Sequence, residues 1–237
     1  MSESGSSLYD DPQLAASYAR VTAANTMNAG YERPALRALL GAVAGLDVLD
    51  AGCAAGEHAA WLVEQGARVT ALDASAAMVR LAGERLGASA RVIRADLGRP
   101  LPFAAGAFDL IVSSLTLHYL ADWLPTLREF ARVLRPGGRL VFSTHHPLLT
   151  IEDGADYRAV RLVDDAFAGF AAEPVPVRFY HRSLERIVAD VLAAGFTLRA
   201  LHEPGPTALT EERDPSMAAQ LRTRPWFLIL EATPPSP

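Results

Sequence analysis

The sequence of 237 residues contains a single cysteine, Cys53, and no long stretch of apolar residues. One cysteine cannot form an internal disulfide, which suits a reducing compartment. No apolar run approaches the roughly 20 residues that a membrane-spanning helix needs. The opening residues, Met-Ser-Glu-Ser-Gly-Ser-Ser, lack the basic and then apolar order of a secretion signal. We therefore expect a cytoplasmic protein without a membrane partner.

Positive charge is also scarce, because 22 Lys and Arg face 27 Asp and Glu, for a net charge of −5. No basic stripe is present, and phosphate neutralisation supplies most of the affinity for nucleic acids, so a nucleic-acid partner is disfavoured. Hydrophobic residues make up 50 % of the chain and charged residues 21 %, as in globular proteins. We find no internal repeat and no domain boundary, so we expect one domain over residues 1–237.

The most informative segment is residues 46–60, Leu-Asp-Val-Leu-Asp-Ala-Gly-Cys-Ala-Ala-Gly-Glu-His-Ala-Ala. A short apolar run ends at Asp50, glycines follow at Gly52 and Gly56, and a helical pattern begins at Glu57. Glycine lets the backbone turn sharply and lets a ligand approach it closely. The order of strand, tight turn and helix N-terminus therefore predicts a nucleotide-sized ligand site in an α/β sheet.

Two of the glycines that a dinucleotide-binding turn requires are absent, because Ala54 and Glu57 stand in their places. A helix N-terminus attracts phosphate, but Glu57 and Asp50 would repel a pyrophosphate there. These acids suit a ligand that brings positive charge, such as an ammonium or a sulfonium. The turn argues against a dinucleotide-dependent oxidoreductase, which stays an alternative, and favours a cationic nucleoside.

Acidic residues end the next two predicted strands. Asp73 ends the strand over residues 68–73, about twenty residues after the glycines, where an acid typically accepts hydrogen bonds from ribose hydroxyls. The alternative for Asp73 is a helix N-cap, a position for which Ser75 competes. Met78, in the following helix, would contact an adenine or pack in the core. Asp96 ends the strand over residues 90–97, and taken alone it would be a loop or cap residue.

Further predicted strands and helices follow, and glycine and proline residues separate them. The pattern predicts strands over residues 108–114, 139–144, 196–202 and 225–231. It predicts helices over residues 57–65, 76–86, 122–134 and 183–194, and a turn at 135–138. Residues 148–180 are the least regular part, and so long a connection usually serves as a functional cap or contains small elements of its own.

Residues 49–56, Leu-Asp-Ala-Gly-Cys-Ala-Ala-Gly, resemble the first motif of class I S-adenosylmethionine-dependent methyltransferases, acid-x-Gly-x-Gly-x-Gly, with Ala54 in place of the middle glycine. Five segments between residues 46 and 147 match that family in order and spacing. The resemblance is to its small-molecule branch (methyltransferase type 11-like). It implies a doubly wound, Rossmann-like α/β fold: a seven-stranded, mostly parallel sheet with an antiparallel last strand and helices on both faces. Residues 8–40, 148–182 and 204–224, which we call the cap segments, would cover the acceptor.

The resemblance also implies that S-adenosyl-L-methionine is the cofactor and that ligands lie at the carboxyl ends of the strands. Asp96 and Leu97 match the family's pair beside the adenine. The residues expected to bind the cofactor are Asp50, Ala51, Gly52, Gly56, His58, Asp73, Ala74, Met78, Asp96, Leu97, Ser113 and His118.

Histidines and tyrosines are the candidates on the acceptor side. An acceptor hydroxyl or ammonium must lose a proton, and histidine titrates in a suitable range. His146 is the first catalytic candidate, because it resembles a His-Pro at this place in related small-molecule enzymes, and His145 is the second. Tyr9, Tyr18, His146 and Tyr180 are the expected acceptor contacts, although tyrosines can equally pack on the domain with their hydroxyls in water.

No tight cluster of histidines and acids suggests a metal site. The leading hypothesis is methyl transfer to O, N or C of a small-molecule acceptor. A non-catalytic S-adenosylmethionine-binding protein and a macromolecular acceptor stay open as alternatives. The sequence leaves the acceptor and the oligomeric state undetermined.

Overall fold

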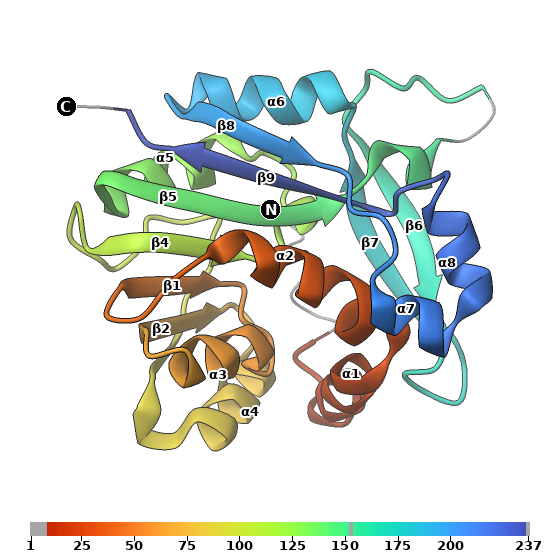
Figure 1. The fold of residues 1–237 in the computed structure, drawn as a ribbon, viewed down its shortest axis with the longest axis horizontal. Coiled ribbons are helices and arrows are strands. Elements are labelled where there is room, and N and C mark those ends of the chain that lie inside the picture. Colours follow the sequence, from red (N-terminus) through yellow and green to blue (C-terminus); the bar gives the residue numbers. More distant parts are fainter. Residues whose placement is uncertain (1–8, 152–153, 236–237) are drawn as a thin grey trace.

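A computed structural model describes residues 9–151 and 154–235 of the chain. Its centre is a seven-stranded sheet with the strand order β3-β2-β1-β4-β5-β9-β8 (Figure 1). The strands are β1 (Asp47–Ala51), β2 (Arg68–Asp73), β3 (Arg91–Arg94), β4 (Phe108–Ser113), β5 (Leu134–His145), β8 (Thr197–His202) and β9 (Phe227–Thr233). Strands β1 to β5 pair in parallel, whereas β9 runs antiparallel to both β5 and β8. The predicted fold class is confirmed.

Helices cover both faces of this sheet. On one face lie α2 (Arg33–Leu40), α3 (Glu57–Glu64) and α4 (Ala76–Leu86), which pack on Val48, Leu110 and other buried residues of the strands. On the other face lie α5 (Leu124–Val133) and α6 (Leu184–Ala193). Because alternate residues of a strand point to opposite faces, the apolar runs of β1 and β4 supply both cores.

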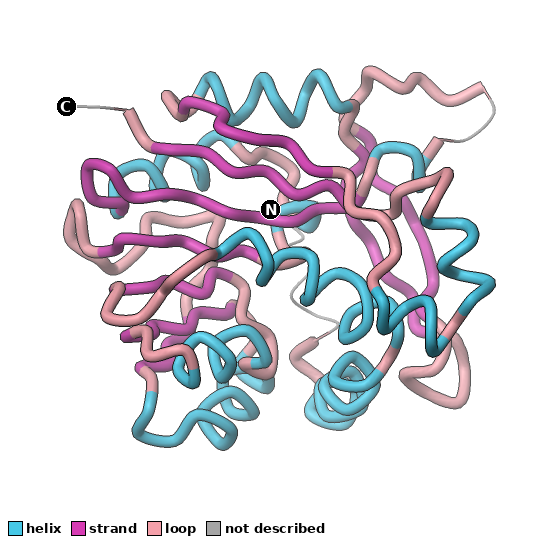
Figure 2. The backbone as a smooth tube through the Cα atoms, in the orientation of Figure 1, coloured by secondary structure: helices cyan, strands magenta, loops and turns pink. Residues whose placement is uncertain are grey.

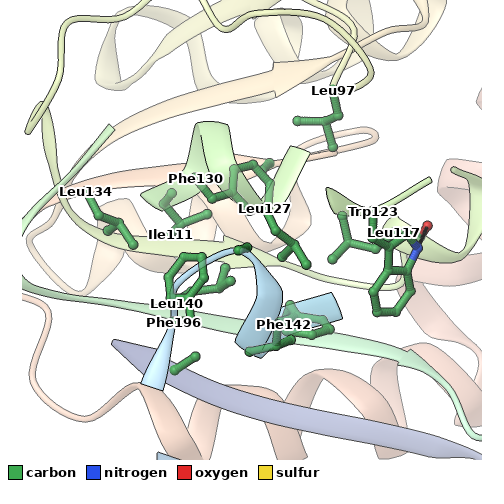
Figure 3. Close-up of a cluster of buried hydrophobic side chains, with 14 of the residues drawn as sticks. Leu97, Ile111, Leu117, Trp123, Leu127, Phe130, Leu134, Leu140, Phe142 and Phe196 are labelled. Atoms are coloured by element: carbon green, nitrogen blue, oxygen red, sulfur yellow. Dashed lines mark hydrogen bonds between the residues drawn. The ribbon is translucent and has the colours of Figure 1, made fainter. Parts of the chain in front are cut away.

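The core beneath α5 is built mainly from leucine and phenylalanine. Leu127 and Phe130 of α5 lie against Ile111 of β4 and Phe142 of β5 (Figure 3). Trp123, just before α5, is 1 % exposed and donates its indole N–H to the Leu117 carbonyl at 2.6 Å. A buried tryptophan with a satisfied N–H anchors a helix at one angle, and here it fixes the loop after β4 beside the sheet.

The remaining elements lie beyond the ends of β4 and β5 (Figure 1). They are α1 (Pro12–Ala24), a π-helix (Thr26–Glu32), β6 (Arg161–Phe167), β7 (Val175–His181), α7 (Ala208–Arg213) and α8 (Pro215–Leu221). Figure 2 shows β6 and β7 as a separate pair of strands, which form an antiparallel two-stranded sheet. These elements belong to the three cap segments, of which residues 8 and 152–153 lie outside the described residues. The division of the chain into one domain stays a prediction.

Two predicted details differ in the structure. Residues 135–138 are not a separate turn, because β5 already begins at Leu134 and passes through Gly137 with φ +79°. The register of β5 against β4 shifts between Phe108 and Leu110, so the glycines form an irregularity inside one long strand. The strand predicted over residues 90–97 is shorter, because β3 covers Arg91–Arg94 and Asp96 lies after its end. Residues 204–224 contain α7 and α8. None of the described helices has the length and apolar character needed to cross a membrane.

Candidate active site

The turn between β1 and α3 depends on left-handed backbone at three positions. Gly52 has φ +84° and Gly56 has φ +82°. A Cβ on Gly52 would lie 2.3 Å from the Thr116 side chain, so only glycine fits there. Ala54, in place of the motif's middle glycine, has φ +46°. A non-glycine residue in this region costs roughly 1–3 kcal/mol, and such strain gathers at functional sites.

Leu115, directly after β4, also has a positive φ of +46°. Among the described residues, Ala54 and Leu115 are the two non-glycine positions with positive φ. Both lie at the carboxyl edge, by which we mean the edge of the sheet where β1, β2, β4 and β5 end. Backbone strain therefore marks the same edge at which parallel sheets bind ligands.

Asp73 holds the glycine turn in shape. Its Oδ2 accepts a hydrogen bond from the Ala54 N–H at 2.9 Å, and its Oδ1 accepts one from the Ser75 N–H at 2.9 Å. Burial raises the pKa of Asp73 despite these bonds. Ser75, rather than Asp73, is the N-cap of α4 and accepts from the Met78 N–H. Each carboxylate oxygen can accept a second hydrogen bond, so the ribose contact of Asp73 stays a prediction.

Asp50 is a buried and partly unsatisfied carboxyl group under the turn. It is 1 % exposed, and burial raises its pKa to about 6. Its Oδ2 has no hydrogen-bond partner in the part of the chain that the structure describes. The neighbouring residues are bonded, since Ser113 donates its Oγ–H to the Ala51 carbonyl at 2.8 Å. A buried carboxylate oxygen without a partner fits the positive charge that S-adenosylmethionine would bring, so the turn is suited to that cofactor.

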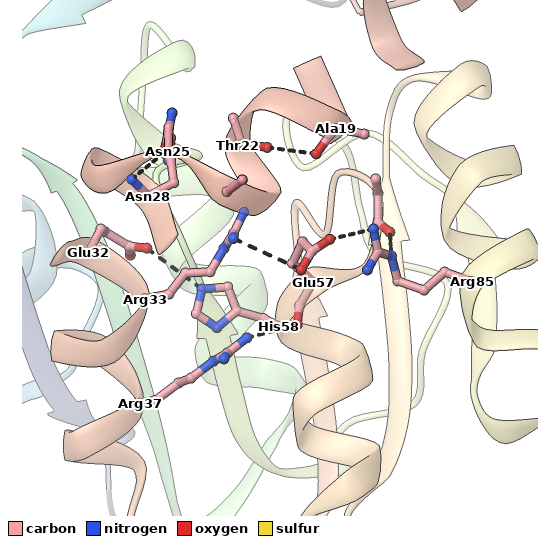
Figure 4. A network of polar contacts seen from close by, with 12 residues as sticks. Ala19, Thr22, Asn25, Asn28, Glu32, Arg33, Arg37, Glu57, His58 and Arg85 are labelled. Atoms are coloured by element: carbon pink, nitrogen blue, oxygen red, sulfur yellow. Dashed lines mark hydrogen bonds and ion pairs between the residues drawn. The ribbon is translucent and has the colours of Figure 1, made fainter. Parts of the chain in front are cut away.

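A polar cluster connects the N-terminal cap segment to the start of α3 (Figure 4). Glu32, the last residue of the π-helix, points toward His58 at the start of α3, with Oε2 3.7 Å from Nε2. Arg33 lies 3.9 Å from Glu57, which also pairs with Arg85. His58 is a predicted cofactor residue, and the structure places it behind the turn, 6 % exposed. Sequence reasoning did not identify Glu32.

The predicted adenine contacts differ in their exposure to solvent. Asp96 keeps 41 % of its side chain exposed and accepts a hydrogen bond from the Gly98 N–H at 2.8 Å. Leu97 is buried in the core beside α5, and Met78 is buried against Tyr9. Ala74 offers its backbone carbonyl to Arg94. Their contacts with the cofactor stay predictions.

Both ring nitrogens of His146 are already bonded. Nδ1 accepts from the Leu148 N–H at 3.1 Å, and Nε2 lies 2.8 Å from Oε1 of Glu203. Because a backbone N–H can only donate, Nδ1 carries no proton and Nε2 donates to the carboxylate. His146 therefore caps the short helix over Pro147–Thr150 and has no free lone pair in this arrangement. This geometry favours His145 over His146 as the group that meets an acceptor.

His145 and His118 form a stacked pair, with ring centroids 4.0 Å apart. Phe179 of β7 lies edge-on to His145 at 4.5 Å. Burial lowers the pKa of His145 to about 4 and also lowers the pKa of His118, so both rings are neutral at pH 7. Nδ1 of each ring has no hydrogen-bond partner among residues 9–151 and 154–235. His145, the second catalytic candidate, also lines a narrow cavity together with Tyr180, a predicted acceptor contact.

Three tyrosines lie over the glycine turn. The hydroxyls of Tyr9 and Tyr119 are 2.8 Å apart, and the ring of Tyr9 meets that of Tyr18 edge-on at 4.9 Å. Tyr18 stacks on Phe170, which lies in the loop between β6 and β7, at 5.2 Å. Tyr9, Tyr18 and Ala54 all pack against one buried cluster, which contains Ala55 of the turn. The structure thus brings both predicted tyrosines to the cofactor side, and it adds Tyr119, which sequence reasoning missed.

Tyr119 and Glu32, which the sequence analysis did not identify, have only weak signals in the sequence. Tyr119 follows His118 in the segment after a buried strand, where ligand contacts are common, and that position could have flagged it. Glu32 precedes Arg33 and Pro34 before a helix, which resembles an ordinary exposed helix start. In the described residues, no group of three His, Cys, Asp or Glu side chains could hold a metal ion.

Comparisons with known proteins identify the family of this chain. Residues 49–142 match the family model described as a methyltransferase domain. The malonyl-[acyl-carrier protein] O-methyltransferase of Salmonella typhimurium is 30 % identical over 89 % of this chain and 86 % of its own length. The enzyme of the same name from Pectobacterium atrosepticum is 34 % identical over 79 % and 75 %.

A solved structure matches over nearly the whole fold. The S-adenosylmethionine-dependent methyltransferase from Mesorhizobium loti is 30 % identical, has a TM-score of 0.69, and is matched over 85 % of this chain and 97 % of its own. The matched family model spans the glycine turn, Asp73 and Asp96. The chain therefore belongs to the class I S-adenosylmethionine-dependent methyltransferases, and S-adenosylmethionine is its methyl donor.

Proposed function

We propose that the protein methylates a small-molecule acceptor at O, N or C, in the space between the glycine turn and the β6–β7 sheet. One observation carries this proposal: the cap segments meet over the carboxyl edge. Tyr9 bonds to Tyr119, and Tyr18 stacks on Phe170. Ser17 also donates its hydroxyl to the Phe170 carbonyl at 2.5 Å. A site enclosed by these contacts suits a small acceptor better than a folded macromolecule.

The residues of this chain would align the reactants rather than supply strong acid–base chemistry. S-adenosylmethionine provides an electrophilic methyl group on a sulfonium, and displacement needs the acceptor in line with it. Proximity and orientation can supply most of that acceleration. Asp73 and the glycine turn would fix the donor, while His145 and Tyr180 would line the acceptor side. His145, with a pKa of about 4, is a weak base but can accept a hydrogen bond from an acceptor hydroxyl.

A second acceptor class is favoured by the same weak basicity. A carboxylate acceptor is already deprotonated at pH 7 and needs no base. Both neutral histidines, His118 and His145, are compatible with such an acceptor. The relatives from Salmonella and Pectobacterium are named for a malonyl group on an acyl carrier protein. We therefore propose a carrier-bound carboxylate as the second candidate.

One assay separates these candidates. The protein is incubated with S-adenosylmethionine labelled on the methyl group and either a small-metabolite fraction or a malonyl thioester on a carrier protein. Label in a small product supports the first candidate, and label on the carrier supports the second. Label in neither, with donor binding intact by calorimetry, would favour a non-catalytic binding protein.

The histidines can be tested in the same assay. His145→Gln should lower kcat/KM about a hundredfold without weakening donor binding, as expected for a group beside the reacting atoms. His146→Gln should instead lower the thermal stability, because it disturbs the bond to Glu203 and the helix cap. The reverse pattern would restore His146 as the acceptor contact. We also infer a cytoplasmic location, supported by the single, buried cysteine.

A further inference from the structure

Among the buried polar atoms at the carboxyl edge that have no hydrogen-bond partner within the described residues, four belong to three neighbouring side chains. They are Oε2 of Glu32, Oδ2 of Asp50, and both ring nitrogens of His58. Glu32 and Asp50 are each 1 % exposed. Native proteins pair nearly all buried polar atoms, so several unpaired atoms in one place call for a ligand or ordered water.

Glu32 is held so that one oxygen is bonded and the other is not. Oε1 accepts hydrogen bonds from the hydroxyls of Ser143 at 2.5 Å and Ser114 at 2.9 Å. Oε2 faces Nε2 of His58 at 3.7 Å, which is too long for a hydrogen bond. Two residues beyond Ser114, Thr116 donates to the Gly52 carbonyl at 3.3 Å. The carboxylate is therefore fixed between the ends of β4 and β5 and the start of α3.

Glu32 keeps its negative charge without an arginine partner among the described residues. Burial alone would raise the pKa of Glu32, but contacts with His58 and the two serines more than offset it, so the pKa is lowered. The nearby arginines point elsewhere: Arg33 pairs with Glu57, and Arg37 donates to the Glu57 carbonyl at 2.9 Å. Among the described ion pairs, Glu32 has contact with His58 and with no arginine.

We propose that Glu32 binds the ammonium group at the amino-acid end of the methyl donor, with His58 and Asp50 completing the site. An ammonium has three N–H donors, and bonds to a carboxylate are among the strongest in proteins. The inference rests on the donor that the family establishes and not on the proposed acceptor. Because Glu32 ends the π-helix of the N-terminal cap segment, the ammonium would join that segment to the sheet.

Calorimetry without any acceptor tests this assignment. S-adenosylhomocysteine keeps the ammonium group and lacks the transferred methyl, and its deamino analogue lacks the amino group. The wild-type protein should bind the deamino analogue about ten- to a hundredfold more weakly. Glu32→Gln should weaken binding of S-adenosylhomocysteine by a similar factor while barely affecting the analogue. Removing the amino group and changing Glu32 together would then weaken binding by little more than either change alone. Such non-additivity identifies a direct contact between the two groups.

A matched control is Glu203→Gln, which changes another carboxylate beside a buried histidine at the same edge. It should leave the ratio of the two affinities at the wild-type value. An unchanged ratio in Glu32→Gln would show a purely structural role and overturn the proposal. The proposal would also be overturned if the ratio of the two affinities fell to about one in Asp50→Asn but not in Glu32→Gln. Asp50 would then hold the ammonium.

Thermal unfolding first checks that each variant folds. Where Glu32→Gln fails to fold, Glu32→Asp keeps the charge but withdraws the oxygens by one carbon. The proposal then expects the affinity ratio to fall part of the way toward one, and an unchanged ratio overturns it. Failure of every acceptor in the methylation assay would not affect these measurements, so the two proposals fail separately.

Discussion

Strand β1 carries two aspartates that lie in opposite environments. Asp47, at its start, accepts hydrogen bonds from Arg68 at 2.7 Å and from Arg135 at 2.8 Å, and these bonds lower its pKa to about 2. Asp50, three residues later, is buried with one oxygen unpaired, and its pKa is raised to about 6. The same side chain is satisfied at one edge of the sheet and incomplete at the other.

This contrast extends across the two edges. At the amino edge, where the parallel strands begin, Arg135 also pairs with Asp109 at 2.6 Å. An open cleft of about 570 Å³ lies there, lined by Asp47, Arg68 and Phe103 among others. The carboxyl edge has strained backbone, unpaired buried groups and neutral histidines. The unpaired buried groups and the strained backbone, rather than the size of a cleft, therefore point to the carboxyl edge as the ligand-binding side of the sheet.

The largest effect is expected when a glycine is replaced at each end of β1. Gly52→Ala should lower the free energy of unfolding by about 3 kcal/mol and abolish donor binding, because its Cβ would meet Thr116 at 2.3 Å. Gly45→Ala, before β1, has a similar φ of +76° but no atom within 4 Å of the added Cβ. It should cost about 1–2 kcal/mol and keep donor affinity. Urea unfolding and calorimetry measure both, and equal losses of affinity would remove the contrast.

The next test uses the pH dependence of stability. A carboxyl whose folded pKa is raised contributes stability below its unfolded pKa, and this contribution is lost as the pH rises through the folded pKa. For Asp50 the window is pH 3.8 to about 6, and the loss is about 3 kcal/mol. Asp50→Asn should therefore gain stability over the wild type by about that amount between pH 4 and 7, measured by urea unfolding.

Asp47→Asn provides the opposite sign. Its lowered folded pKa means that Asp47 contributes stability above pH 3.8, and this is lost as the pH falls toward 2. The variant should thus lose stability relative to the wild type at pH 7 and match it in strong acid. If both variants shift in the same direction, the two edges do not differ electrostatically.

A smaller effect is expected from the tyrosines. Tyr9→Phe removes the hydroxyl that meets Tyr119 and should cost about 1 kcal/mol, with a several-fold loss of donor affinity. Tyr157→Phe removes a hydroxyl that accepts from the Leu184 N–H, outside the glycine turn, and should leave donor affinity unchanged. Calorimetry with S-adenosylhomocysteine compares them. Unchanged affinity in Tyr9→Phe would mean that the tyrosines cover the turn without supporting it.

The smallest effect belongs to the amino edge. Arg68 keeps 63 % of its side chain exposed, so its pair with Asp47 is screened by solvent. Arg68→Ala should leave the free energy of unfolding almost unchanged and should not change donor affinity. A clear loss of donor affinity in this variant would contradict the division of roles between the edges.

The sequence predicted best where short-range patterns decide the structure. Strand β2, helix α4 and the turn from Gly52 to Gly56 follow from apolar periodicity and glycine placement, and the structure has them at the expected residues. Helix α6 begins after Ser183, which caps it as its position predicts. These features depend on neighbours a few residues apart, which a single sequence displays directly.

What the sequence could not predict depends on contacts between distant residues. Glu32 contacts His58 and Ser143, and Tyr119 contacts Tyr9, 110 positions away. His146 resembles a catalytic residue by position, yet its bond to Glu203 joins two loops that no local pattern relates. The pairing of β6 with β7 was not predicted either, because residues 148–180 show no regular pattern in the sequence.

The position of β9 has a consequence for how the chain folds. β9 lies between β5 and β8, and β8 pairs with no other strand of the described sheet. During synthesis β8 therefore emerges from the ribosome before its only neighbour exists. The side of β5 that pairs with β9 likewise has no partner until residues 227–233 have been synthesised. Sheet completion should be a late step that closes contacts far apart in the chain, and such contacts form slowly.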